Sequence, residues 1–185
     1  MPNRSSTMTD ISSTPHNVIL IGFMGTGKTS IGRRVAQSLG FDFVDTDDQI
    51  VESAGKAIAD IFSDEGEDYF RALETDALQS CGDSTNQVIA TGGGLVLRDK
   101  NRELLSEAGY VIWLKASAEA ILERVSRNHG RPLLQTENPL QTINALLQER
   151  EGFYASAADF IIDTDGLSAD ETAFGICESA RVVFG

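Results

Sequence analysis

Short apolar runs alternate with longer amphipathic stretches along most of this 185-residue chain. Five runs are short and apolar, which is typical of buried strands, at 18–21, 41–44, 88–90, 111–114 and 160–162. Six stretches have helical periodicity, and several begin with Ser, Asp or Asn at the cap position, at 29–39, 64–79, 99–108, 117–126, 139–155 and 168–183. Because strands that alternate with helices form a parallel sheet covered on both faces, the pattern predicts an α/β fold.

The chain has no internal repeat and no linker, so we expect a single domain over residues 17–185. Residues 1–16 are rich in Ser and Thr and lack an apolar core, which predicts a disordered tail and not a secretory signal. A Ser-rich organelle transit peptide is the alternative, but such a peptide would carry more arginine. Cytoplasm is therefore the expected compartment.

Composition narrows the possible partners. The formal charge of −13 argues against binding to nucleic acid or to anionic membranes, and no apolar run approaches the ~18 residues of a membrane span. Cys81 and Cys177 are far apart and lack metal-ligand spacing, which favours a reducing compartment. We expect a protein that acts on small molecules.

The segment 22–29, GFMGTGKT, fits the phosphate-binding pattern G-x-x-x-x-G-K-[ST] and follows the first predicted strand. Its glycines let backbone N–H groups turn toward an anion, Lys28 adds a positive charge for the β- and γ-phosphates, and the Thr29 hydroxyl can ligate Mg²⁺. A helix that begins near Lys28 directs its positive dipole end at the same phosphates. An ordinary Gly-rich turn is the alternative; the strand before and the helix after favour a nucleotide site.

Polar residues also follow the second and third predicted strands, where ligands of open α/β sheets gather. Asp45 and Asp47 alternate at a frayed strand end and are expected to face opposite sides. Asp45 would then hold a water of the Mg²⁺ shell, and Asp47 would accept a proton from a substrate hydroxyl. The alternative is that Asp47 or Asp48 caps the next helix. Residues 92–94, all glycine, allow backbone to approach a ligand, although a flexible turn would look identical.

Three arginines are candidate ligands for anions. Arg71 lies between apolar neighbours and could offer a planar fork to a carboxylate; its alternative is an intrahelical pair with Glu67, Glu74 or Thr75. Arg131 lies in an irregular tract that is a candidate lid, where it would act as an arginine finger. Arg150 is either a ligand or a surface residue.

Together these residues resemble the shikimate kinase family, small P-loop kinases related to the nucleoside monophosphate kinases. Four patterns carry the resemblance in order: GFMGTGKT at 22–29, F-x-D-x-D at 43–47, F-R-x-x-E at 70–74 followed by the glycines at 92–94, and R-P-L-L at 131–134 with Arg150 downstream. The resemblance spans residues 17–184. It implies a three-layer P-loop NTPase fold with a five-stranded parallel sheet in 2-3-1-4-5 order, a substrate-binding segment near 46–74 and a mobile lid near 124–136.

The resemblance also implies transfer of the ATP γ-phosphate to the 3-hydroxyl of shikimate, in chorismate and aromatic amino-acid biosynthesis, by a monomer. It assigns ATP to Gly25, Thr26, Gly27, Lys28, Thr29, Ser30 and Arg131, and Mg²⁺ to Thr29 and, through water, Asp45. It assigns shikimate to Asp47, Arg71, Gly93 and Arg150, with Gly92 and Gly94 completing the candidate backbone turn. Lys28, Asp47 and Arg131 are the expected catalytic residues.

Two departures from the family pattern and two rival functions remain. Gly152 stands where many relatives have Pro, and the loop 163–167 lacks an Arg near adenine, so Arg124 or Arg127 is a candidate for stacking on the purine. A gluconate-type kinase would also need a carboxylate site and hydroxyl contacts. A GTPase switch would need an Asn-Lys-x-Asp guanine reader, which the sequence lacks.

Overall fold

The computed structural model describes residues 16–126 and 136–185. Its centre is a five-stranded parallel sheet in the order β2-β3-β1-β4-β5, as the resemblance to the family implies. The strands are β1 Val18–Ile21, β2 Asp42–Asp45, β3 Gln87–Ala90, β4 Tyr110–Lys115 and β5 Phe160–Asp163. The central strand β1 is fully buried because both faces of the sheet are covered.

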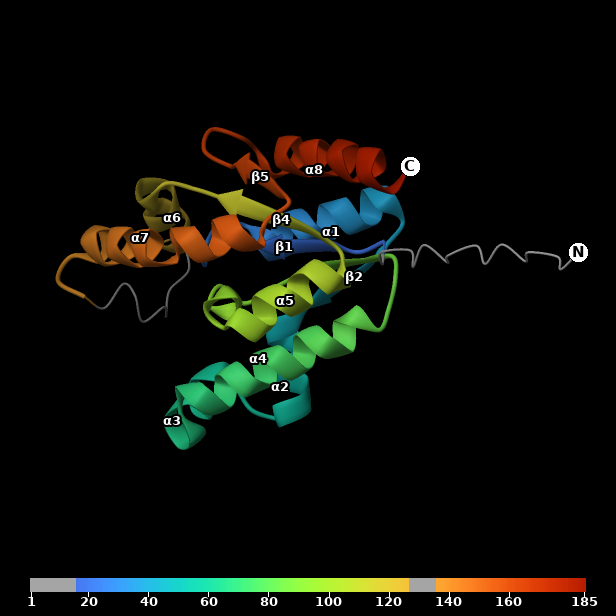
Figure 1. Ribbon diagram of the computed structural model, residues 1–185. Coiled ribbons are helices and arrows are strands. Elements are labelled where there is room, and N and C mark those ends of the chain that lie inside the picture. Colours follow the sequence, from blue (N-terminus) through green and yellow to red (C-terminus); the bar gives the residue numbers. More distant parts are fainter. Residues whose placement is uncertain (1–15, 127–135) are drawn as a thin grey trace, which may run out of the picture.

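Helices follow the strands and form the two outer layers (Figure 1). They are α1 Lys28–Leu39, α2 Thr46–Ala54, α3 Ile58–Glu65, α4 Glu67–Gly82, α5 Asp99–Ala108, α6 Ala118–Ser126, α7 Pro139–Ala157 and α8 Ala169–Phe184, with a 3₁₀ turn η1 at Leu95–Leu97. Helices α1 and α8 pack on one face of the sheet, and α4, α5 and α7 pack on the other. None of the helices within the described ranges is long and apolar enough to span a bilayer.

Alternating strand residues divide the core into two halves. Val18 and Leu20 of β1 pack with α1 and α8, whereas Ile19 and Ile21 pack with α4, α5 and α7. A third cluster, which includes Phe23, joins the loop after β1 to α6 and α7. A fourth, small cluster holds α2, α3 and α4 together, so this helical segment has a core of its own beside the sheet.

The same helical segment departs from the sequence prediction. The single helix expected at 64–79 is wrong, because Gly66, at a φ of 84°, separates α3 from α4. Helix α2 begins directly after β2, so Asp47 lies in a first helical turn and not at a frayed strand end. The periodicity of this segment is short and interrupted by glycine, and its apolar residues serve a small local cluster, which weakens the helical signal.

Candidate active site

The phosphate-binding segment forms the turn between β1 and α1. Gly25 and Gly27 have φ values of 80° and 92°, which side chains rarely adopt, so glycine is needed for the turn. Helix α1 begins at Lys28, as predicted, and Gly27 at its N-cap has no side chain that could cap the helix. The turn therefore offers the N-terminus of α1, with the positive end of its dipole, to an anion.

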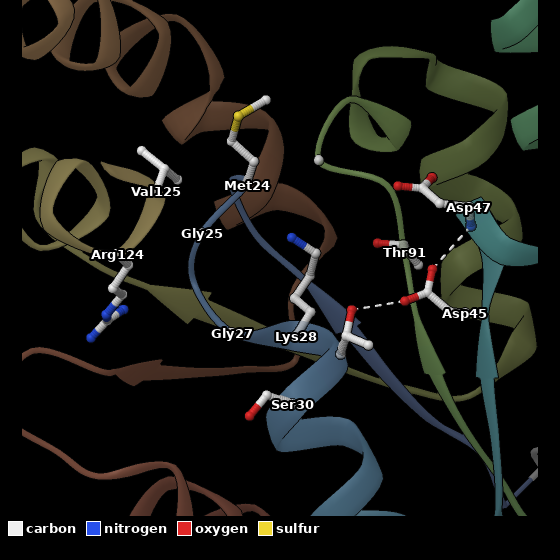
Figure 2. Close-up of a pocket in the computed structure, with 12 residues that line it drawn as sticks. Met24, Gly25, Gly27, Lys28, Ser30, Asp45, Asp47, Thr91, Arg124 and Val125 are labelled. Carbon is white, nitrogen blue, oxygen red and sulfur yellow. Dashed lines mark hydrogen bonds between the residues drawn. The ribbon is translucent and has the colours of Figure 1, made fainter. Parts of the chain in front are cut away.

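Lys28 is held along this turn. Its Nζ donates to the carbonyl oxygens of Gly22 at 2.7 Å and Phe23 at 2.9 Å. The neighbouring Thr29 faces the opposite side of the cleft, where its hydroxyl donates to Oδ2 of Asp45 at 2.8 Å. Figure 2 shows the ammonium group of Lys28 between the glycine turn and the two aspartates.

Asp45 is fixed from two directions. While Oδ2 accepts the Thr29 hydroxyl, Oδ1 accepts the backbone N–H of Asp47 at 3.1 Å and caps α2 (Figure 2). The helix cap is thus Asp45, and the alternative that Asp47 or Asp48 serves as the cap is wrong. The Asp45 carboxylate thus contacts Thr29 of the phosphate turn, whereas Asp47 meets it through its backbone N–H, and the division of roles between the two aspartates stays a prediction.

A cleft of about 380 Å³ opens between these groups. It is lined by the phosphate turn, by both aspartates, by residues after β3 and by α6, namely Met24, Gly25, Gly27, Lys28, Thr29, Ser30, Asp45, Asp47, Thr91, Gly93, Arg124 and Val125. The carboxyl ends of three neighbouring strands therefore converge on one cavity, as the topology requires.

Asp47 carries an unusual carboxylate. Burial raises the pKa of Asp47, the negative charges of Asp45 and Asp48 raise it further, and Lys28 and Arg71 oppose the shift. Among the described residues its Oδ1 has no hydrogen-bond partner although the atom is buried. A buried acceptor without a donor is costly to the free protein.

Glu74 of α4 lies beside Asp47. Its residue is 1% exposed, burial raises its pKa with Arg71 as the main opposing influence, and its Oε1 is likewise buried without a described partner. A Cβ added to Gly92 would lie 2.5 Å from that oxygen and 2.8 Å from Asp47 Oδ1, so only glycine fits between them. Sequence reasoning treated Glu74 only as a possible partner of Arg71; its position on the apolar side of α4 was the available signal.

Arg71 forms intrahelical pairs with Glu67 and Glu74, which the sequence offers as the alternative to a ligand role. Its guanidinium donates to Glu74 Oε2 at 2.6 Å and to Glu67 Oε1 at 3.0 Å. The same group lies so close to Gly94 that no Cβ could be accommodated there. Arg71 therefore both pairs within α4 and faces the glycine turn after β3.

Arg150 of α7 is not a free surface residue. Its guanidinium lies over the ring of Phe23, with 5.5 Å from Cζ to the ring centroid, and its Nε is buried without a partner in the described part of the chain. Phe23 belongs to the phosphate turn, so Arg150 lies against that turn, although it is not among the residues that line the cleft. Sequence reasoning did not select Phe23, whose place in the turn is a variable position of the motif.

The other predicted residues lie around this centre. Ser30 is exposed on the first turn of α1, and Arg124 lines the cleft, where it donates to Oγ1 and the carbonyl oxygen of Thr164, each at 3.0 Å. Arg131 and most of the expected lid at 124–136 lie outside the described residues.

Comparison with known proteins agrees with this arrangement. The family model described as "Shikimate kinase" matches residues 24–181. The chain belongs to the shikimate kinase family. Shikimate kinase of Thermodesulfovibrio yellowstonii is 50% identical over 85% of this chain and 90% of its own length, and that of Geobacter sulfurreducens is 46% identical over 92% and 94%.

Solved structures extend the agreement to the fold. Shikimate kinase from Acinetobacter baumannii, in complex with shikimate, has a TM-score of 0.86 at 38% identity and covers 92% of this chain and 95% of that one. Shikimate kinase from Aquifex aeolicus has a TM-score of 0.78 at 31% identity, with 91% and 99% covered. A gluconokinase from Sinorhizobium meliloti, at 17% identity, TM-score 0.53 and coverage of 92% and 97%, shares the fold alone.

Proposed function

We propose that this chain transfers the γ-phosphate of ATP to the 3-hydroxyl of shikimate and forms shikimate 3-phosphate and ADP. The observation that carries the proposal is the meeting of two sites: a phosphate turn with Lys28, and an acceptor side with Asp47, Arg71 and Arg150 around the glycines at 92–94. Family membership supports the same reaction.

On the acceptor side, Arg71 and Arg150 are proposed to bind the carboxylate of shikimate. Both are planar forks that suit a carboxylate, and the buried, unpartnered Nε of Arg150 supports a donor reserved for a ligand. Arg71 has Glu67 as a second, exposed partner that an incoming carboxylate can replace while the bond to Glu74 remains. The turn at 92–94 would contribute backbone contacts.

Asp47 is proposed to accept the hydroxyl proton as the 3-oxygen attacks phosphorus. A raised pKa makes Asp47 a stronger base than an ordinary carboxylate, and its unpartnered Oδ1 supports this role. Lys28 lies close enough to influence that pKa, so base and phosphate ligand are neighbours. Transfer then depends on positioning and on charge neutralisation, without a covalent enzyme intermediate.

On the nucleotide side, the N–H groups of residues 25–30 are proposed to bind the phosphates. Arg124, at the cleft wall and braced by Thr164, is proposed to stack on the purine; Arg127 was the other candidate and lies outside the described residues. Arg131 is proposed as the arginine that neutralises the transferring phosphate.

Thr29 and Asp45 are proposed to hold Mg²⁺, Asp45 through a water. Two hard oxygen donors already lie 2.8 Å apart at the cleft, which suits an ion that takes few protein ligands. When bound, the ion would neutralise charge on the β- and γ-phosphates.

An acceptor panel tests the proposal. ADP release is measured with Mg²⁺ and ATP against shikimate, gluconate and nucleoside monophosphates, with the Lys28→Ala protein as the background control. We expect turnover with shikimate alone. Turnover with gluconate, or tight ATP binding without any shikimate-dependent turnover, would reject it.

We further propose that the enzyme is a monomer of the cytoplasm, with a substrate-binding segment at 46–74 inside a single domain. Both cysteines of the chain are free and buried, which supports a reducing compartment. Light scattering behind size exclusion tests the monomer, which should have a mass of 20.0 kDa.

A further inference from the structure

Tyr154 is an unexplained buried group beside the acceptor site. It lies on α7 four residues after Arg150, so the two side chains project from the same side of the helix. Its residue is 1% exposed, and its ring stacks on Trp113 of β4, with centroids 5.5 Å apart and an interplanar angle of 22°. Only Ile143 and Tyr154 are buried along α7, and Ile143 packs toward α6. Tyr154 is therefore the residue that anchors the second half of α7 to the sheet.

The hydroxyl group of Tyr154 reaches the glycine turn. It donates to the carbonyl oxygen of Gly93 at 2.5 Å, across 61 residues of sequence. Gly93 in turn packs against the phosphate turn, because a Cβ placed there would lie 3.2 Å from the backbone nitrogen of Met24. One hydrogen bond thus connects the helix that carries Arg150 to the backbone that lines the cleft.

The charged groups that act on the hydroxyl group of Tyr154 belong to two helices of the acceptor side, α4 and α7. Burial raises the pKa of Tyr154 to about 12, while Arg150 and Arg71 act in the opposite direction and Glu74 adds to the rise. The hydroxyl group therefore remains protonated, and a donor, at every pH at which a kinase works. Tyr154 is therefore within electrostatic reach of the two arginines that are proposed to bind one carboxylate.

We propose that Tyr154 is a positioning residue for shikimate, whose hydroxyl group holds Arg150 at the spacing from Arg71 that a single carboxylate can bridge. The inference rests on the function proposed above. Ring stacking on Trp113 fixes where α7 lies, and the bond to Gly93 fixes how the helix is oriented about the cleft. The phosphate turn does not depend on this bond, because its own contacts hold Lys28.

Tyr154→Phe removes the hydroxyl group and keeps the stacked ring. We expect the KM for shikimate to rise on the order of tenfold, with kcat within about threefold and the KM for ATP unchanged. The matched control is Tyr110→Phe. Tyr110 lies on β4, away from the cleft, and its hydroxyl group is hydrogen-bonded to Ser179 Oγ at 2.6 Å. Its loss should change none of the three constants. Thermal unfolding of both variants separates lost positioning from lost stability.

A double-mutant cycle with Arg150→Ala tests whether Tyr154 acts on shikimate binding through Arg150. If Tyr154 acts through Arg150, the hydroxyl group should matter little once Arg150 is gone, so the tenfold rise should shrink to about twofold or less. Full additivity of the two changes would overturn the proposal, as would equal increases in the KM values of shikimate and ATP, or an unchanged KM for shikimate.

If the proposed function is wrong, the wild-type protein itself gives a different result. The fluorescence of Trp113, the single tryptophan of the chain, reports shikimate binding without turnover because its ring contacts Tyr154. A wild-type protein that neither binds nor phosphorylates shikimate would reject the function itself. A wild type that does both, together with a Tyr154→Phe protein of unchanged shikimate affinity, would reject only the role of Tyr154.

Discussion

The two sides of the cleft are built in different ways. The phosphate side is one continuous segment, residues 22–30, whose donors are backbone N–H groups and whose one ammonium group is bonded to carbonyl oxygens of the same turn. The acceptor side is assembled from α2, α4, the turn after β3, and α7, and it uses charged side chains. The phosphate side is thus a local backbone motif, whereas the acceptor side depends on tertiary packing.

The two sides also differ in how much they destabilise the ligand-free protein. Three buried atoms around the acceptor side have no described hydrogen-bond partner: Asp47 Oδ1, Glu74 Oε1 and Arg150 Nε. Each such atom costs about 1–3 kcal/mol, whereas backbone donors at an exposed helix N-terminus remain hydrated and cost little. The acceptor side is therefore held in a binding geometry at the expense of stability, and the phosphate side is not.

Loss of Lys28 should have the largest effect on activity. Lys28→Ala removes the charge that neutralises the transferring phosphate, so we expect kcat to fall on the order of 10²–10³-fold. Shikimate affinity, measured by fluorescence titration, should stay nearly unchanged because no proposed shikimate ligand is lost. Lys115→Ala is the control, since Lys115 pairs with Glu151 at 2.8 Å outside the cleft. An equal loss of shikimate affinity would contradict the separation of the two sides.

Loss of Arg71 should instead weaken the acceptor. Arg71→Ala is expected to reduce shikimate binding by about 1.5–3 kcal/mol, with a smaller change in the KM for ATP. The variant should also unfold more easily, because Glu74 loses the partner that is bonded at 2.6 Å. Arg102→Ala removes a comparable, partly buried arginine that pairs with Asp99 on α5, and should leave shikimate binding intact. Reduced binding in both variants would indicate a general loss of stability.

Gly92→Ala tests the close approach of the two carboxyl groups. The added methyl group would meet Glu74 Oε1 and Asp47 Oδ1, so the turn or α4 must shift at a cost of about 1–3 kcal/mol in the free energy of unfolding. Shikimate binding should fall with it. Gly152→Ala is the matched control, since nothing lies within 4 Å of a Cβ at that position in α7. If the two variants have the same free energy of unfolding, the contacts around Gly92 are less tight than the structure indicates.

The contrast between the two sides also explains how far sequence alone could reach. The parallel α/β sheet and the phosphate turn were predictable, because strand and helix periods are local and the turn uses neighbouring residues, whereas the strand order was implied only by the family resemblance. Helix α2 and the break at Gly66 were missed, because that segment packs in a small cluster with short, interrupted periodicity.

The burial and the partners of individual side chains were harder to predict from the sequence. The pattern at 70–74 marked Arg71, but the buried state of Glu74 and its closeness to Asp47 depend on three elements that meet only in the fold. The bond between Tyr154 and Gly93 spans 61 residues, so the partner of Tyr154 could not be predicted from the sequence. Residue types were thus predictable and their ionisation and partners were not, since these depend on tertiary burial.

The smallest effect we expect is a gain in stability. Asp47→Asn keeps the shape of the side chain and removes a charge whose burial is unfavourable, so the ligand-free protein should melt at a higher temperature, by roughly 2–4 °C for each kcal/mol gained. Activity should fall at the same time, by less than in the Lys28→Ala protein, because an amide cannot accept the hydroxyl proton. Asp48→Asn, which changes an exposed carboxylate one residue away, should not increase the melting temperature.

The pH dependence of that gain makes the test specific. The pKa of Asp47 is raised in the folded protein above the ordinary value of 3.8, so the folded state binds the proton more tightly than the unfolded chain. Its contribution to stability is therefore most favourable at low pH and is lost as pH rises from 3.8 through the folded pKa. Burial is the main cause of the raised pKa of Asp47, the charges of Asp45 and Asp48 reinforce it, and Lys28 and Arg71 oppose it; Asp47 in turn raises the pKa of Glu74. The advantage of Asp47→Asn in urea unfolding should accordingly widen from acid to neutral pH; a constant difference would mean that the acceptor side carries no electrostatic cost at Asp47.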